Sequence, residues 1–142
     1  MHREILILSA AGLILMGCAG PTAPHGIRNG RLAPCPSSPN CVSSQEGDLA
    51  PLPMPEGGPA EAMAKIEAIV KTMKHSEIVE KTDEYLHVAF KSPILGFVDD
   101  VEFCAEPGAA AVHFRSAARS GWYDFGVNKR RMEEIRKLFL AK

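Results

Sequence analysis

The chain has 142 residues, of which 46% are hydrophobic and 23% are charged, and its formal net charge is −1. This length predicts one domain, and the composition excludes an intrinsically disordered chain. A net charge so close to zero gives no long-range attraction to nucleic acid, so nucleic-acid binding is not expected.

The first residues have the pattern of a secretory signal peptide. A short basic start, Met1–Arg3, precedes an almost unbroken apolar run from Ile5 to Met16. This run is shorter than the roughly 20 residues that a membrane-spanning helix needs. It suits the hydrophobic part of a signal peptide, and we expect residues 1–17 to be removed.

The apolar run ends in Leu15-Met16-Gly17-Cys18, which resembles the lipobox of bacterial lipoproteins. The resemblance implies cleavage before Cys18, lipid such as palmitate on that cysteine, and anchoring in a bilayer, since several acyl chains anchor stably. Ala19 replaces the aspartate that usually retains such lipoproteins at the inner membrane, which favours the outer membrane if the cell has two. An ordinary signal peptide or an uncleaved anchor are the alternatives.

Residues 18–32 are rich in Pro, Gly and small polar residues. We expect a flexible tether there, about 45 Å long when extended at roughly 3.3 Å per residue. Cys35 and Cys41 then bracket a Pro-rich turn that could bring their thiols together. Export permits disulfides, whereas two cysteines lack the second pair that a zinc site needs. We therefore expect a Cys35–Cys41 disulfide, no metal, and a free thiol at Cys104.

Two segments, 60–74 and 127–141, have apolar side chains at the spacing of an amphipathic helix. In the first, the expected buried residues are Met63, Ile66, Ile69, Val70 and Met73. In the second, the expected stripe is Val127, Arg131, Ile135 and Leu138, with Met132 and Phe139 beside it.

Four expected strands lie between these helices, at residues 77–81, 85–90, 97–103 and 111–116. The order helix, four strands, helix predicts an α+β fold: a four-stranded antiparallel sheet with two helices packed on one face. Residues 33–142 would form this single domain.

The last two strands are joined by Glu106-Pro107-Gly108-Ala109, a typical turn sequence. A hairpin closed by this turn would place Val101 opposite Phe114 and Asp100 opposite Arg115, with one apolar and one charged face. Asp99 would be the exception, because it falls on the apolar face opposite Ser116.

Three motifs in order resemble those of a family of proteins with a domain of unknown function, DUF1499. They are Cys35–Ser44, Gly96–Phe103, and Arg115–Gly121 followed by Asp124, Gly126, Asn128 and Arg131. The similarity covers about Leu32 to the C-terminus. The family includes exported bacterial lipoproteins, in agreement with Cys18, and the resemblance implies no activity. The chain departs from the pattern at Ala118, where a serine is commoner, and at Cys104, where an apolar residue is commoner.

The polar residues around the hairpin form the candidate site. They are Asp99, Asp100, Glu102, His113, Arg115, Ser116, Arg119, Asp124, Asn128 and Arg131. An unpaired buried carboxylate is costly, so we expect Asp99 to pair with Arg119, Arg131 or backbone amides at the start of the second helix. Asn128 could cap that helix.

The sequence favours a membrane-anchored envelope lipoprotein with a non-catalytic scaffold or binding role and no cofactor. Its partner would be an envelope protein or a small-molecule ligand, and Trp122 and Tyr123 have the composition of an interface anchor. The alternative is a hydrolase-like or other enzyme that uses Asp99 or Asp100 as acid or base, with Arg115 or Arg119 binding an anion. The sequence shows no motif of an activated nucleophile, such as a Ser-His-Asp order. It also has no phosphate-binding loop and no clustered His ligands.

Overall fold

The computed structural model describes residues 24–141. Cys18, the expected signal peptide and the first part of the expected tether lie outside the described residues. The helices are α1 (Gly58–Thr72) and α2 (Val127–Leu140). The long strands are β5 (Ser76–Lys81), β6 (Tyr85–Lys91), β7 (Val98–Cys104) and β8 (Ala111–Ala118). The short strands are β1 (Ile27–Arg28), β2 (Arg31–Leu32), β3 (Cys41–Ser43) and β4 (Leu52–Pro53).

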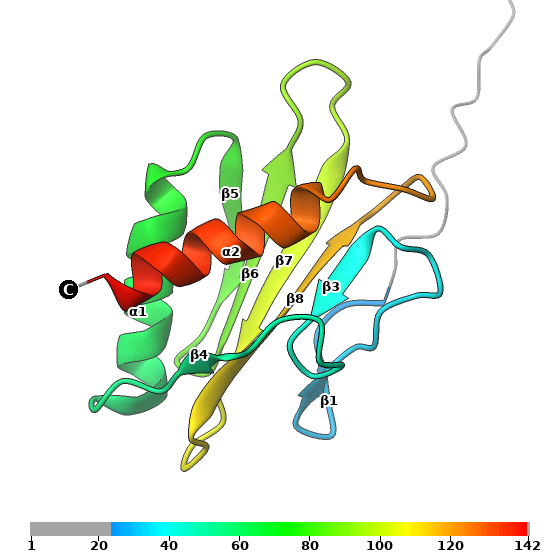
Figure 1. The fold of residues 1–142 in the computed structure, drawn as a ribbon. Coiled ribbons are helices and arrows are strands. Elements are labelled where there is room, and N and C mark those ends of the chain that lie inside the picture. The colour runs from blue at the N-terminus through cyan, green and yellow to red at the C-terminus, as the bar shows by residue number, and fades with distance from the viewer. Residues whose placement is uncertain (1–23, 142) are drawn as a thin grey trace, which may run out of the picture.

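The main sheet has six antiparallel strands in the order β3-β8-β7-β6-β5, with β4 also paired to β8 (Figure 1). The expected α+β class is confirmed, but the expected number of four strands is wrong. The two additional strands have only three and two residues, too few to show an alternating pattern in the sequence. β1 and β2 form a separate two-stranded hairpin.

Both helices share one hydrophobic core with a single face of the sheet. The stripe expected on α1 is confirmed, since Met63, Ile66 and Val70 are fully buried. From the sheet, Leu86, Val88, Phe90, Val101, Phe103 and Phe114 join the same core. In Figure 1, α2 crosses the strands of this sheet at a steep angle.

The buried stripe of α2 differs from the expected one by one position. Its buried residues are Asn128, Met132, Ile135 and Phe139, whereas Val127 and Leu138 are each 40% exposed. The helix is therefore oriented so that a buried asparagine and three bulky apolar side chains face the sheet. Val127 and Leu138 instead border a surface hollow.

The β7–β8 hairpin has the expected faces but not the expected register. Glu102 lies opposite Arg115 and Phe103 opposite Phe114, a shift of two residues from the prediction. Ala105 and Ala110 do not pair with each other, because the Ala105 N–H donates to the Glu84 carbonyl and the Ala110 carbonyl accepts from the N–H of Met54. A shift of two preserves which side chains share a face, so the division into an apolar and a polar face is confirmed.

The polar face of the sheet is covered by the N-terminal segment, residues 24–34. The sequence placed most of this segment in a flexible tether, but residues 27–32 form the β1–β2 hairpin, closed by Asn29 and Gly30 with positive φ angles. Leu32 packs with Tyr85 and Cys104 in a second, small apolar cluster. Any tether is therefore shorter than expected.

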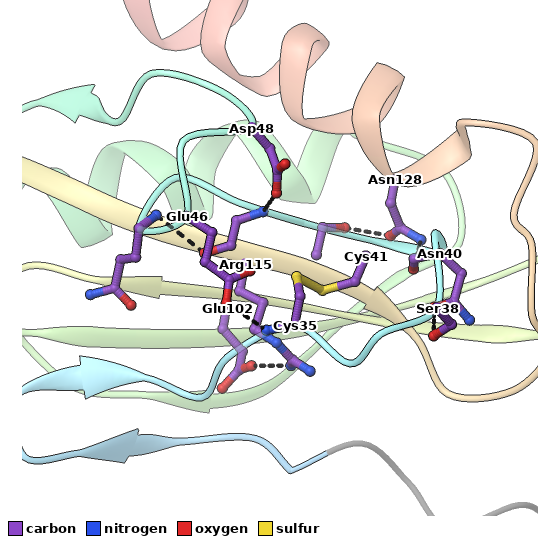
Figure 2. The surroundings of a disulfide bond; sticks show 12 residues. Cys35, Ser38, Asn40, Cys41, Glu46, Asp48, Glu102, Arg115 and Asn128 are labelled. Atoms are coloured by element: carbon purple, nitrogen blue, oxygen red, sulfur yellow. Dashed lines mark hydrogen bonds and ion pairs between the residues drawn. A yellow bond between two sulfur atoms is a disulfide. The ribbon is translucent and has the colours of Figure 1, made fainter.

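The Cys35–Cys41 disulfide closes the N-terminal segment onto the sheet edge. Cys41 and Ser43 of β3 pair with Ala117 and Arg115 of β8, so the disulfide lies on the polar face, and Figure 2 shows it beside Arg115 and Glu102. The predicted disulfide is present in the structure, and Cys104 is a buried free thiol. Between residues 24 and 141, no helix combines the length and apolar character needed to cross a bilayer.

Candidate functional site

The predicted site residues separate into groups on the two faces of the sheet. Asp99, Ser116, Asn128 and Arg131 meet on the helix-covered face, and Asp124 adjoins them at the start of α2. Asp100, Glu102, Arg115 and Arg119 lie on the opposite face, beneath the N-terminal segment. The structure therefore contains two polar clusters rather than one constellation.

Asp99 pairs with Arg131, one of the partners expected from the sequence. Arg131 Nη2 donates to Asp99 Oδ2 at 2.6 Å, and Arg131 Nη1 donates to Asn128 Oδ1 at 2.8 Å. The same guanidinium lies 4.6 Å from the centroid of the Phe90 ring. Ser116 Oγ completes the group by donating to Asn128 Oδ1 at 2.5 Å. This cluster joins the start of β7 to the beginning of α2.

Asp124 caps α2, whereas the sequence predicts Asn128 as the cap. Its carboxylate accepts hydrogen bonds from the backbone N–H groups of Gly126 and Asn128, both at 2.9 Å. Burial acts to raise the pKa of Asp124, but these hydrogen bonds outweigh it and lower the pKa. Asn128 is fully buried, and its side-chain amide donates to the Asn40 carbonyl and to Asp124.

Glu102 and Arg115 form an ion pair with both side chains completely buried, at 3.0 Å. The Tyr85 hydroxyl and the Gly26 backbone N–H both donate to the other carboxylate oxygen, at 2.7 and 2.5 Å. Burial, and then the hydrogen bond to Glu102, raise the pKa of Tyr85, so the hydroxyl keeps its proton. Arg115 Nε and Nη2 have no hydrogen-bond partner among the described residues.

Asp100 forms the second buried group of the polar face. Arg119 donates to its two oxygens at 2.8 Å each, and His87 Nε2 lies 2.7 Å from Oδ1. Burial favours a raised pKa for Asp100, but the hydrogen bonds from Arg119 and His87 outweigh burial and hold the pKa well below its usual range. His25 of the N-terminal segment stacks over His87, with ring centroids 5.2 Å apart.

His87 and Tyr85 are the network members that sequence reasoning did not select. Both point away from the helices, and they are only 6% (Tyr85) and 3% (His87) exposed. The candidate residue His113 lies outside both clusters, because it faces Cys104 and lies 3.2 Å from the Ser44 hydroxyl. The sequence does not predict that the N-terminal segment covers this face of the sheet.

More than half of the large exposed apolar side chains among the described residues lie at one end of the sheet, which we call the loop end. It consists of residues 92–97 between β6 and β7 and residues 119–126 between β8 and α2, in the upper part of Figure 1. Trp122 is 67% exposed and Tyr123 is 58% exposed. Ile94, Leu95, Phe97 and Phe125 are exposed at the same end.

Two hollows adjoin the loop end, and Asp99 and Val127 line both. A mainly apolar hollow of about 300 Å³ lies between the two loops and includes Leu95, Phe97, Tyr123 and Phe125. A larger hollow of about 650 Å³ lies between the end of α1 and the start of α2. Its charged lining is Lys74, Lys91, Asp99, Arg130, Arg131 and Glu134.

The described residues offer no complete metal-ligand set. Cys35, Glu46 and Asp48 have suitable donor atoms close together, but the Cys35 sulfur is in the disulfide. Glu46 accepts from the Cys35 backbone N–H at 3.2 Å and Asp48 accepts from that of Ser43 at 2.9 Å. These carboxylates therefore serve the local turn.

The comparisons with known proteins identify a family but no activity. The model of the family described as "protein of unknown function (DUF1499)" matches residues 31–139. No curated protein and no solved structure gives a significant match.

We expect Asp99→Asn to lower the free energy of unfolding by about 2 kcal/mol, because it removes a charged hydrogen bond and leaves Arg131 without its anion. Thermal unfolding should show a decrease of several degrees in Tm. Glu133→Gln, which removes an exposed carboxylate from the same helix, is the control and should leave Tm unchanged. An unchanged Tm in the Asp99 variant would mean that Asp99 is not a structural group.

We expect Asp100 to make the protein sensitive to acid. Its pKa is lower in the folded than in the unfolded chain, so its contribution to stability is complete above about pH 4 and is lost as pH falls toward the folded pKa. Urea denaturation at pH 7 and pH 3 should show a smaller acid-induced loss of stability for Asp100→Asn than for the parent. Asp83→Asn, in an exposed turn, should keep the parent's dependence. Equal pH dependence in all three proteins would contradict this assignment.

Proposed function

Because the chain belongs to the DUF1499 family, whose description assigns no activity, we propose a function from its own sequence and surface. We propose that it is an exported, lipid-anchored protein of the cell envelope with a non-catalytic binding role. The binding surface is the loop end.

The anchor is supported by the first residues of the chain. A basic start, an apolar run and the lipobox-like Leu15–Cys18 occur in the order that signal peptides of lipoproteins require. Cleavage before Cys18 leaves that residue as a lipidated N-terminus. Ala19 favours transfer to the outer membrane in a cell with two membranes.

The exposure of the aromatic side chains at the loop end carries the binding role. Trp122, Tyr123 and Phe125 fall within four consecutive residues, and each is more than half exposed. Large exposed apolar patches on a folded protein usually mark an interaction site. Their neighbours Leu95 and Phe97 extend the patch and border the apolar hollow.

The acidic groups fit a structural role better than catalysis. Asp100 is 4% exposed and already holds Arg119 and His87, and its lowered pKa makes it a poor general acid or base at neutral pH. Arg115 is fully buried against Glu102, so it is not placed to bind an anion from solvent. Asp99 borders both hollows but is committed to Arg131.

The anchor predicts that labelled palmitate enters the protein in growing cells and that Cys18→Ala abolishes the label. The matched control is Cys104→Ala, which removes a buried thiol and should leave labelling intact. Absence of label from the parent would contradict the lipid anchor.

The binding role predicts that a photo-crosslinking residue at position 122 forms an adduct in intact cells. The same residue at position 83, in the exposed turn at the opposite end of the sheet, should form none. Electrophoresis and mass spectrometry identify the adduct. Equal yields at both positions, or none at position 122, would contradict the loop end as the binding surface.

A further inference from the structure

We propose that the partner of the loop end is the bilayer that holds the anchor: the two loops enter the membrane interface, and the basic residues around them contact anionic headgroups. The proposal rests on the lipid anchor proposed above. It identifies the membrane surface as the partner that the exposed aromatic residues contact.

The apolar side chains of the loop end come from two adjacent loops. Ile94 is 91%, Leu95 71%, Trp122 67% and Phe125 77% exposed. Tryptophan and tyrosine are the residues most enriched at membrane–water interfaces, and this end contains Tyr123 as well as the single tryptophan of the chain. Leucine, isoleucine and phenylalanine supply the area that inserts between headgroups.

The loops are already folded in a form that suits an environment poor in water. In the first loop, Ser92 and Phe97 exchange backbone and side-chain hydrogen bonds of 2.8 and 2.9 Å. In the second, the Phe125 carbonyl accepts from Arg130 Nη1 at 2.8 Å and the Gly121 carbonyl accepts from Asn40 Nδ2 at 2.5 Å. Backbone groups that are paired within the protein cost less to move into lipid.

Basic residues without an ion-pair partner lie beside the loop end. Lys74, Lys91, Lys129 and Arg130 are exposed there and form no ion pair among residues 24–141. The opposite end has mixed charge, because Asp83, Glu84 and Glu106 are exposed there and Arg28 and Arg31 of the β1–β2 hairpin lie on the same side. Basic residues next to an inserted apolar patch are attracted by anionic lipid, which favours contact through the loop end.

The carboxylates at the loop end oppose this field only weakly. Asp99 is paired with Arg131, and Asp124 is occupied by the backbone amides of α2. Glu134 is exposed one turn beyond Arg130 on α2 and lines the larger hollow with Lys74, Lys91 and Arg130. Glu134 and the exposed Glu77 near the start of β5 offset part of the positive charge. The four exposed basic groups outnumber these two carboxylates, so the charge beside the loop end is positive.

The short spacing from the anchor keeps the domain at the membrane. Cys18 precedes Pro24 by six residues, which span at most about 20 Å. From Pro24 onward the chain is packed on the sheet, because His25 stacks on His87 and Gly26 bonds Glu102.

The direction of this packed segment points to the loop end. Gly30 lies against Glu106 at the opposite end, whereas Gly26 lies against Glu102, farther toward the start of β7. Followed backward toward the anchor, the chain therefore runs toward the loop end. Glu102 is four residues from Val98, or about 14 Å along the strand, within reach of the spacing to Cys18.

Trp122 reports this contact directly, because it is the only tryptophan in the protein. The full lipidated protein is purified from cells and reconstituted into vesicles of phosphatidylglycerol and phosphatidylcholine, with or without bromine on the acyl chains. We expect Trp122 emission to shift to shorter wavelength and to be strongly quenched by the brominated lipids. Lys91→Glu with Arg130→Glu should reduce the quenching, and Lys137→Glu, near the opposite end of α2, should not.

The outcomes separate the docking from the anchor. Protein that floats with the vesicles while Trp122 keeps an aqueous emission spectrum and is not quenched would overturn the docking and leave the anchor intact. Protein that does not float with vesicles would overturn the anchor and, with it, the docking. Protection of Trp122 only after an envelope protein is added would show a protein partner and overturn the bilayer proposal.

Discussion

The buried ion pair between Glu102 and Arg115 constrains the whole architecture. Both side chains are fully removed from solvent on the face of the sheet that the helices do not cover. A charge pair in such a place costs desolvation energy unless further hydrogen bonds satisfy it. The Tyr85 hydroxyl and the Gly26 backbone supply them for Glu102, whereas Arg115 Nε and Nη2 have none among the described residues. Through its bond to Glu102, the N-terminal segment forms a third layer of the domain. Removal of that layer would expose the pair to water and leave Gly26 without its acceptor.

The alternation of the strands revealed the faces of the sheet but not its register. Opposite charges face each other in both registers, because Arg115 is opposite Asp100 in the predicted hairpin and opposite Glu102 in the structure. In the observed register, the backbone groups of Ala105 and Ala110 bond to Glu84 and Met54, contacts that side-chain patterns do not report. The same limit applies to α2, where tertiary packing selects Asn128 over Val127 for burial.

The N-terminal layer had a recognisable signal that composition concealed. Asn29-Gly30 is the dipeptide most typical of a two-residue hairpin, and both residues have the positive φ angles that such a turn requires. Because this region is rich in Pro and Gly, the sequence predicts a flexible tether. The polar face of the sheet would then be exposed to solvent. The sequence includes Arg131 among the possible partners of Asp99, because strand alternation places this carboxylate on the face that α2 covers. It also identifies Trp122 and Tyr123, because two large aromatic residues follow each other in a loop. The separation of the polar residues into two buried clusters depends on the N-terminal segment, which the sequence does not predict to cover the sheet.

The position of the disulfide determines how the domain responds to force. If the bilayer pulls on the chain ahead of Pro24, residues 24–34 can peel from the sheet one contact at a time, since β1 and β2 pair with each other and not with the main sheet. Unfolding from this end stops at Cys35, because the disulfide transmits the force to Cys41 in β3. Residues 24–34 extend to about 35 Å at roughly 3.3 Å per residue before any strand of the core carries tension. If the chain is held at the proposed anchor, this segment acts as a mechanical buffer ahead of the core.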